Sequence, residues 1–186
     1  MSQDFDIKIY GGADNTAGKD TELYSNETEY NKEKSNGNIN RARALGQTVA
    51  EEFVNVCRKD ELTLSENDSE QLVTQRILLL SFTVMVGLEQ FCPNITLANA
   101  SRSAFFDKLY ELDRELFDKS SDTGAFSFYY LSFRRGSEVE RRIGQTFAML
   151  CLHDGDPIYQ ELGEALYCWF FSLVENNTKG AGFVEN

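Results

Sequence analysis

The sequence predicts an all-α protein, built as a single helical bundle of about six helices. Apolar residues recur every three or four positions through most of the chain after residue 38, which is the period of amphipathic helices. The 186 residues include only two prolines, and turn-rich stretches are scarce after residue 40. This combination favours helices joined by short connections over a β sandwich.

The first 37 residues differ from the rest of the chain. They are rich in Gly, Asn, Ser and Thr and carry eight acidic residues against four lysines. Beyond a short alternating segment at Phe5, Ile7 and Ile9, they have little to bury. We therefore expect residues 1–37 to form a flexible acidic tail, followed by a helical bundle domain over residues 38–186.

The first two helices are predicted over residues 39–59 and 65–91. In the first, Leu45, Val49 and Phe53 follow one another at intervals of four and form an apolar stripe. The C-terminal half of the second helix is apolar on nearly every side. A helix of that kind lies at the centre of a bundle.

The third helix is predicted over residues 101–119, ending in the polar loop Ser120–Gly124. A short fourth helix, residues 125–135, is rich in Phe and Tyr. Gly136 is then well placed to end it in the left-handed conformation.

The fifth helix is predicted to begin at Ser137, where Ser137–Glu140 has the residue pattern of a capping box, and to stop at residues 153–155. Asp156 and Pro157 are typical of an N-cap followed by the first helical position, so they open the sixth helix. That helix is expected to run to about residue 177, with a frayed end beyond Lys179.

One internal similarity links the two halves of the bundle. Arg43–Ala50 matches Arg141–Ala148 in the pattern R-x-[LI]-G-Q-T-[VF]-A. A duplicated two-helix unit with a pseudo-twofold axis produces such a match, and so does chance over eight residues. Glycine inside a helix costs about 1 kcal/mol relative to alanine, so such a glycine indicates close helix contact rather than chemistry. The glycines of this kind are Gly46, Gly87, Gly144 and Gly163.

Charge excludes two classes of partner. The formal net charge is -12, so neither nucleic acid nor an anionic membrane surface is an expected partner. The acidic N-terminus lacks the pattern of a signal peptide, and the apolar run Ile77–Leu88 is shorter than the roughly 18–20 residues of a membrane span. The four cysteines form no CxxC pair, which favours free core thiols in a cytoplasmic protein.

Four arginines form the first candidate site: Arg134, Arg135, Arg141 and Arg142. They bracket a predicted helix start, whose free amides favour an anion, and guanidinium groups bind carboxylate or phosphate in bidentate fashion. The hypothesis is a small anion or an acidic segment of a protein partner. The alternative is that these arginines cap a helix and pair with Glu138 and nearby acids.

The repeated motif supplies the second candidate site. Arg43 and Gln47 are four residues apart and share a helix face, as do Arg141 and Gln145. Packed about a pseudo-twofold axis, the four side chains would converge on one polar cleft for an anionic or amide-bearing ligand. The alternative is a solvated outer stripe.

His153, the only histidine, has Asp154 and Asp156 beside it and is a candidate general base, metal ligand or ligand-binding residue. The alternative is a helix-terminal histidine that interacts with the helix dipole. The sequence has no recognisable nucleophile motif, no metal-ligand spacing and no dinucleotide or phosphate loop. We therefore predict no catalytic residue, no metal and no cofactor.

Part of the C-terminal half carries a resemblance. Ala125–Leu131 with Arg134–Gly136, and Ile143–Thr146 through to Asp156-Pro157, resemble an uncharacterised all-helical bacterial protein family. The resemblance implies a bacterial cytoplasmic protein of unknown function, and it carries over no catalytic residue.

The leading functional hypothesis is a non-enzymatic binding or protein-interaction domain. One alternative is a small enzyme whose site is assembled from His153, Asp154 and the Arg/Gln pairs. Another is a structural homodimer subunit built around the aromatic-rich helices. The identity of any partner stays open at this point.

Overall fold

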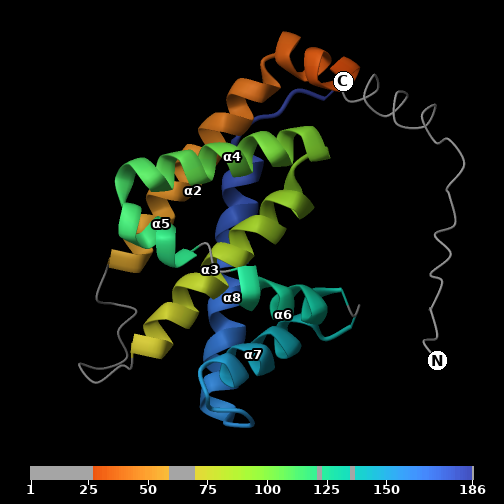
Figure 1. The fold of residues 1–186 in the computed structure, drawn as a ribbon. Helices are drawn as coiled ribbons and strands as arrows, with labels where there is room; N and C mark the ends of the chain where they lie inside the picture. The colour runs from red at the N-terminus through yellow and green to blue at the C-terminus, as the bar shows by residue number, and fades with distance from the viewer. Residues whose placement is uncertain (1–26, 59–69, 121–122, 135–136, 186) are drawn as a thin grey trace, which may run out of the picture.

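The computed structural model describes residues 27–58, 70–120, 123–134 and 137–185 (Figure 1). These residues are almost entirely helical and contain no strand, which confirms the all-α class. They form eight helices rather than about six. A helix over residues 27–35 comes first. The others are α2 (Asn38–Arg58), α3 (Glu70–Phe91), α4 (Ile95–Leu112), α5 (Arg114–Ser120), α6 (Thr123–Phe133), α7 (Val139–Leu150) and α8 (Pro157–Gly180).

The third predicted helix differs from the structure in two ways: it starts earlier and it is divided into two helices. In each case a polar side chain accepts a hydrogen bond from a backbone N–H. Asn94 caps α4, its Oδ1 accepting a hydrogen bond from the Leu97 N–H at 3.0 Å, so the helix begins earlier than predicted. Asp113 is extended and its Oδ1 accepts from the Leu116 N–H at 2.9 Å. A short side chain that satisfies a free N–H in this way starts a new helix, which separates α5 from α4.

The two predicted caps of the last helices have opposite outcomes. The capping box at Ser137 is wrong: the residue before α7 is Glu138, which lies in the left-handed region at φ 54 and forms no side-chain cap. The cap at Asp156 is confirmed, since its Oδ1 accepts from the Ile158 N–H at 2.9 Å with Pro157 in the first turn.

The end of the chain is more ordered than predicted. Helix α8 continues to Gly180, and the residues after it pack against the start of α2. Asn38, which is buried, holds Val184 at two points: its Nδ2 donates to the Val184 carbonyl at 3.0 Å and its Oδ1 accepts from the Val184 N–H at 2.9 Å. The frayed end predicted beyond Lys179 is therefore wrong for the residues up to 185.

Of the predicted flexible tail, residues 1–37, the structure describes only the part from residue 27 onward. Residues 27–35 of this part are helical. Glu33 is 3% exposed. Its carboxylate accepts hydrogen bonds from the amide Nδ2 atoms of Asn36 at 3.1 Å, Asn38 at 2.7 Å and Asn94 at 3.0 Å. This Glu33 amide cluster joins the 27–35 helix to α2 and α4. Residues 1–26 of the predicted tail lie outside the described residues.

Helices α3 and α8 cross at the middle of the molecule, with α2, α4 and α5 toward one end and α6 and α7 toward the other (Figure 1). Each end has an aromatic core. Phe53 meets Phe105 and Phe170 edge-on, with ring centroids 5.5 and 6.1 Å apart. At the other end, Phe82 stacks on Tyr129 at 5.2 Å. Buried aromatic pairs of this kind contribute both apolar area and favourable ring geometry.

Helix α3 has the length and composition of a membrane span, but most of its apolar window is buried inside the bundle. Apolar residues on every side of α3 are covered by its neighbours, as expected for the central helix of a bundle.

The glycine of each repeat copy lies at a close helix contact. A Cβ on Gly46 would stand 2.1 Å from the Ser101 carbonyl oxygen of α4, and one on Gly144 would stand 2.3 Å from the Gln160 carbonyl oxygen of α8. Close contact predicted from these glycines is therefore confirmed. The two copies differ, however, in which helix they contact. Helix α2 packs chiefly on α4, whereas α7 packs on α8, the next helix in the chain.

Leu152 provides a local test of backbone strain. It ends α7 in the left-handed conformation, at φ 64, and is 82% exposed. Its N–H donates to the Met149 carbonyl at 3.0 Å, and the His153 N–H to the Ala148 carbonyl at 2.9 Å, which together make a Schellman motif. Glycine adopts this conformation without steric penalty, so we expect Leu152→Gly to raise the free energy of unfolding by about 1 kcal/mol in urea denaturation. Leu152→Ala, the control, retains a Cβ and should give no such gain.

Candidate functional site

Two of the four predicted anion-binding arginines make contacts within the protein. Arg141 forms an ion pair, and Arg142 donates a hydrogen bond to a carbonyl near the end of a helix. Arg141 Nη1 lies 3.8 Å from Glu138 Oε1, and both side chains are largely exposed, so the pair contributes little. Arg142 Nε donates to the Ser132 carbonyl near the end of α6 at 3.3 Å. Its Nη2 is enclosed and meets no described partner.

Of the other two arginines of that group, only Arg134 lies within the described residues. Arg134 is exposed at the turn after α6 and lines a separate hollow of about 400 Å³, shared with Glu89 and Tyr130. Arg135 lies outside the described residues. The contacts of Arg141 and Arg142 agree with the alternative interpretation for these two side chains, and the anion site of the whole group stays a prediction.

His153 is exposed, and its ring stacks flat on Tyr159, with centroids 3.8 Å apart and 8° between the planes. Within the described ranges, neither a hydrogen bond nor an ion pair joins it to Asp154. The same ranges hold no group of three or more His, Cys, Asp or Glu side chains that could bind a metal ion. The stack on Tyr159 accounts for the position of this ring.

The thiols have pKa values that keep them protonated at neutral pH. Burial raises the pKa of Cys57 and of Cys151 to about 12, although the nearby Arg76 guanidinium acts in the opposite direction. A protonated thiol is a poor nucleophile. Cys168 corrects the expectation of core thiols, because it is exposed on α8.

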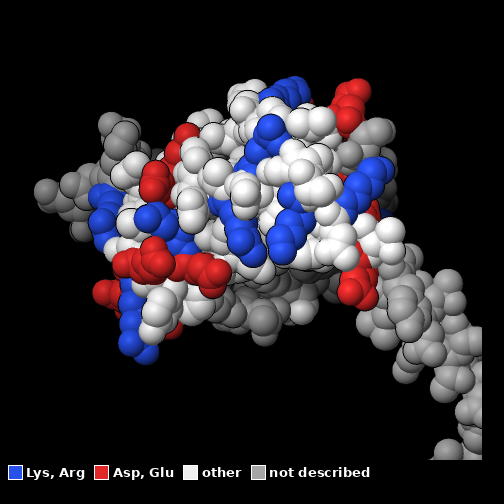
Figure 2. All heavy atoms as spheres, turned by 90° about the horizontal axis from the view of Figure 1, so that it is seen from above, with Lys and Arg blue, Asp and Glu red and all other residues white. Residues whose placement is uncertain are grey.

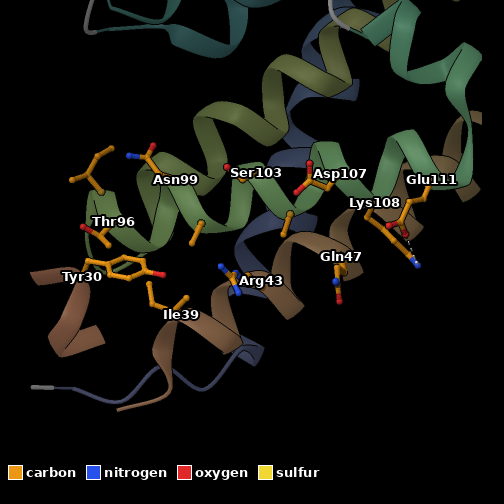
Figure 3. A pocket seen from close by; sticks show the side chains of 13 residues that line it. Tyr30, Ile39, Arg43, Gln47, Thr96, Asn99, Ser103, Asp107, Lys108 and Glu111 are labelled. Carbon is orange, nitrogen blue, oxygen red and sulfur yellow. Dashed lines mark ion pairs between the residues drawn. The ribbon is translucent and has the colours of Figure 1, made fainter. Parts of the chain in front are cut away.

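Two of the predicted site residues line a groove of about 790 Å³ between α2 and α4, which we name the α2–α4 groove (Figure 3). It exists because Gly46 brings the two helix backbones almost into contact, so larger side chains on both sides of the seam project outward. Arg43 and Gln47, three residues before and one after this glycine, line the groove from α2.

The groove has two ends of different character, with Arg43 between them (Figure 3). Tyr30, Thr96 and Asn99 lie at one end. Asp107, Lys108 and Glu111 lie at the other. Ser103 borders the middle from α4. The middle of the groove therefore holds the guanidinium of Arg43 and the hydroxyl of Ser103.

Charge pairing leaves Arg43 as the available cation of the groove. Lys108 Nζ lies 3.8 Å from Glu51 Oε1 and 3.9 Å from Glu111 Oε2, so its charge is shared between two acids. Arg43 has no carboxylate within 4.0 Å in the described part of the chain. Figure 2, which looks onto this end of the molecule, shows basic side chains across the middle of the face and acidic ones toward its edges.

Only half of the second predicted site is assembled here. Arg43 and Gln47 line the α2–α4 groove, whereas Arg141 and Gln145 lie on α7, near the opposite end of the bundle, and do not border it (Figure 1). Sequence reasoning missed the side chains from α4. Asn99, Ser103 and Asp107 do recur every four residues, but a polar stripe of this kind is typical of any solvated helix face.

The comparisons with known proteins add neither a family nor a function. A scan against protein-family models, a search of curated proteins and a search of solved structures each found no match.

Proposed function

We propose that this protein is a non-catalytic, cytoplasmic binding domain that holds a small anionic ligand in the α2–α4 groove. The observation that carries the proposal is the position of Arg43 at the middle of the groove without a described acidic partner, in a chain of net charge -12. An arginine left unpaired among so many acids is available for a ligand. Location in a reducing compartment is supported by four free cysteines.

The chemistry around Arg43 favours a compact anion. A guanidinium binds carboxylate or phosphate through two parallel hydrogen bonds, and Gln47 and Ser103 add neutral donors. Asp107 and Glu111 at one end would repel a long polyanion. The groove volume of about 790 Å³ falls within the range of small-molecule sites, roughly 300–1,000 Å³.

The apolar side chains of the groove indicate the rest of the ligand. Ile39 lies with Tyr30 at the end away from the acids, and Ile95, which precedes Thr96 in the chain, also lines the groove. A ligand with one carboxylate or phosphate and a short apolar portion would place its charge on Arg43 and its apolar portion against these side chains.

Removing the charge of Arg43 tests this function. With inorganic phosphate and succinate as probes, we expect amide shift changes in two-dimensional NMR spectra to concentrate on groove residues such as Arg43 and Ser103. Arg43→Gln should weaken binding by about tenfold or more, because hydrogen bonds to charged groups contribute about 1.5–3 kcal/mol.

The matched control is Arg141→Gln, which removes the same charge from an exposed arginine outside the groove. It should leave the affinity for both probes almost unchanged. Equal losses in the two variants, or shift changes spread over the whole surface, would reject the α2–α4 groove as the site.

A further inference from the structure

A second groove lies on another flank of α2, where this helix meets α8. This α2–α8 groove has a volume of about 830 Å³ and shares no lining residue with the α2–α4 groove. Its walls include Glu52 from α2 and Trp169 and Asn177 from α8. The proposal below therefore rests on different residues from the proposed function.

Trp169 is the only tryptophan in the chain, and it is 46% exposed. A large aromatic ring left half in water at the wall of a groove offers a stacking surface. The face of an indole ring carries negative electrostatic potential and attracts the cationic groups of Lys and Arg. Ala44 and Leu173 supply apolar surface in the same groove for the aliphatic stem of such a side chain.

Two further features make the groove attractive to a cation. Glu52 Oε2 accepts a hydrogen bond from Asn177 Nδ2 at 2.9 Å, which fixes the carboxylate at the groove wall. Helix α8 ends at Gly180, which also lines the groove, and the last carbonyls of a helix carry partial negative charge. Carboxylate, helix end and indole face thus all favour positive charge.

Arg41 is the one basic side chain of the described groove lining. Arg41 Nη1 donates to the Asn36 carbonyl at 3.0 Å and to Asn38 Oδ1 at 3.4 Å, so its guanidinium is held by its own chain. Over longer distances, the net charge of -12 attracts basic partners and accelerates encounter.

We infer that the α2–α8 groove is a docking site for a basic segment of a protein partner, with a Lys or Arg side chain stacked on Trp169 and paired with Glu52. The apolar groove wall contacts the stem of that side chain, and the end of α8 stabilises its charge.

The single tryptophan makes the site directly observable. With tetra-arginine amide as the probe at about physiological ionic strength, titration should change the Trp169 fluorescence. In calorimetry, we expect Trp169→Leu and Glu52→Gln each to weaken binding by about two- to fivefold, the equivalent of roughly 0.5–1 kcal/mol for an exposed cation–π contact or ion pair. Circular dichroism should show that both variants remain folded, since neither side chain is fully buried.

The decisive control is Glu51→Gln, which removes the same charge from the neighbouring residue of α2, on the flank where Glu51 lies near Lys108. Tetra-arginine amide should bind this variant as tightly as the unaltered protein. Equal losses in Glu51→Gln and Glu52→Gln would mean attraction to the acidic surface in general. Unchanged affinity in Trp169→Leu, or calorimetric binding with no change in tryptophan fluorescence, would also overturn the inference.

Discussion

Replacing Gly46 by alanine should lower the free energy of unfolding by about 3 kcal/mol or more. The added Cβ would stand 2.1 Å from the Ser101 carbonyl oxygen and 2.9 Å from the Phe105 backbone nitrogen, both on α4. These backbone atoms belong to a regular helix and cannot rotate away as a side chain would. The two helices must separate, which loosens the edge-on contact of Phe53 with Phe105 and costs more than ordinary overpacking.

Equilibrium denaturation in urea, followed by far-ultraviolet circular dichroism, measures this loss. Gly180→Ala is the matched control, because a Cβ there meets no atom within 4 Å. It should be neutral or slightly stabilising, since alanine is the better helix former. Gly144→Ala, whose Cβ would stand 2.3 Å from the Gln160 carbonyl oxygen, should behave like Gly46→Ala. A loss below about 1 kcal/mol in Gly46→Ala would contradict the close packing of α2 on α4.

Substituting Glu33 by glutamine should also destabilise the fold strongly, by about 2–4 kcal/mol. The carboxylate accepts hydrogen bonds from three asparagine amides in a buried site, whereas glutamine has one carbonyl oxygen and adds an NH₂ group that faces other donors. Each buried donor left without an acceptor costs about 1–3 kcal/mol. Because the cluster connects the 27–35 helix, α2 and α4, we expect the 27–35 helix to detach first, as hydrogen exchange would show.

The contribution of Glu33 should depend on pH in a definite direction. Desolvation acts to raise the pKa of Glu33, but hydrogen bonds from Asn38, Asn36 and Asn94, with the charge of Lys32, hold it below its ordinary value. Its stabilising effect is therefore complete above the unfolded-state pKa of about 4.3, and it is lost as the pH falls through the lower folded-state pKa.

Urea denaturation at a series of pH values tests this. The difference in unfolding free energy between the unaltered protein and Glu33→Gln should be constant near neutral pH and should shrink only below about pH 4. Glu161→Gln, at an exposed position of α8, should show little difference at any pH. A difference that stayed constant down to about pH 2 would mean that the Glu33 charge contributes nothing.

The Glu33 amide cluster also explains why the helix at residues 27–35 is not predicted from the sequence. Residues 27–37 carry a single large apolar side chain, Tyr30, so their composition favours a flexible tail. What orders them is a buried polar network whose other members are distant: Asn94 is 61 positions from Glu33, and Val184 is 146 positions from Asn38. No local pattern marks a carboxylate that will be enclosed by amides from three segments.

The sequence by itself determined the features that depend only on residues close to one another in the chain. Apolar residues that recur every three or four positions determined the all-α class and showed which face of each helix is buried. Asp156-Pro157 determined where α8 begins, and the interior glycines marked close helix contacts. Such features follow from local hydrogen bonding and from the helical period, which a single stretch of chain contains.

The tertiary structure alone decided which helices meet, and with that it decided the site. Two copies of one motif were expected to converge, yet α2 packs on α4 and α7 on α8, so Arg43 and Gln47 line a groove that Arg141 and Gln145 do not reach. The physical reason is that periodicity specifies the buried face of a helix but not the surface that covers it. That choice is made by the shape and volume of side chains far apart in the chain.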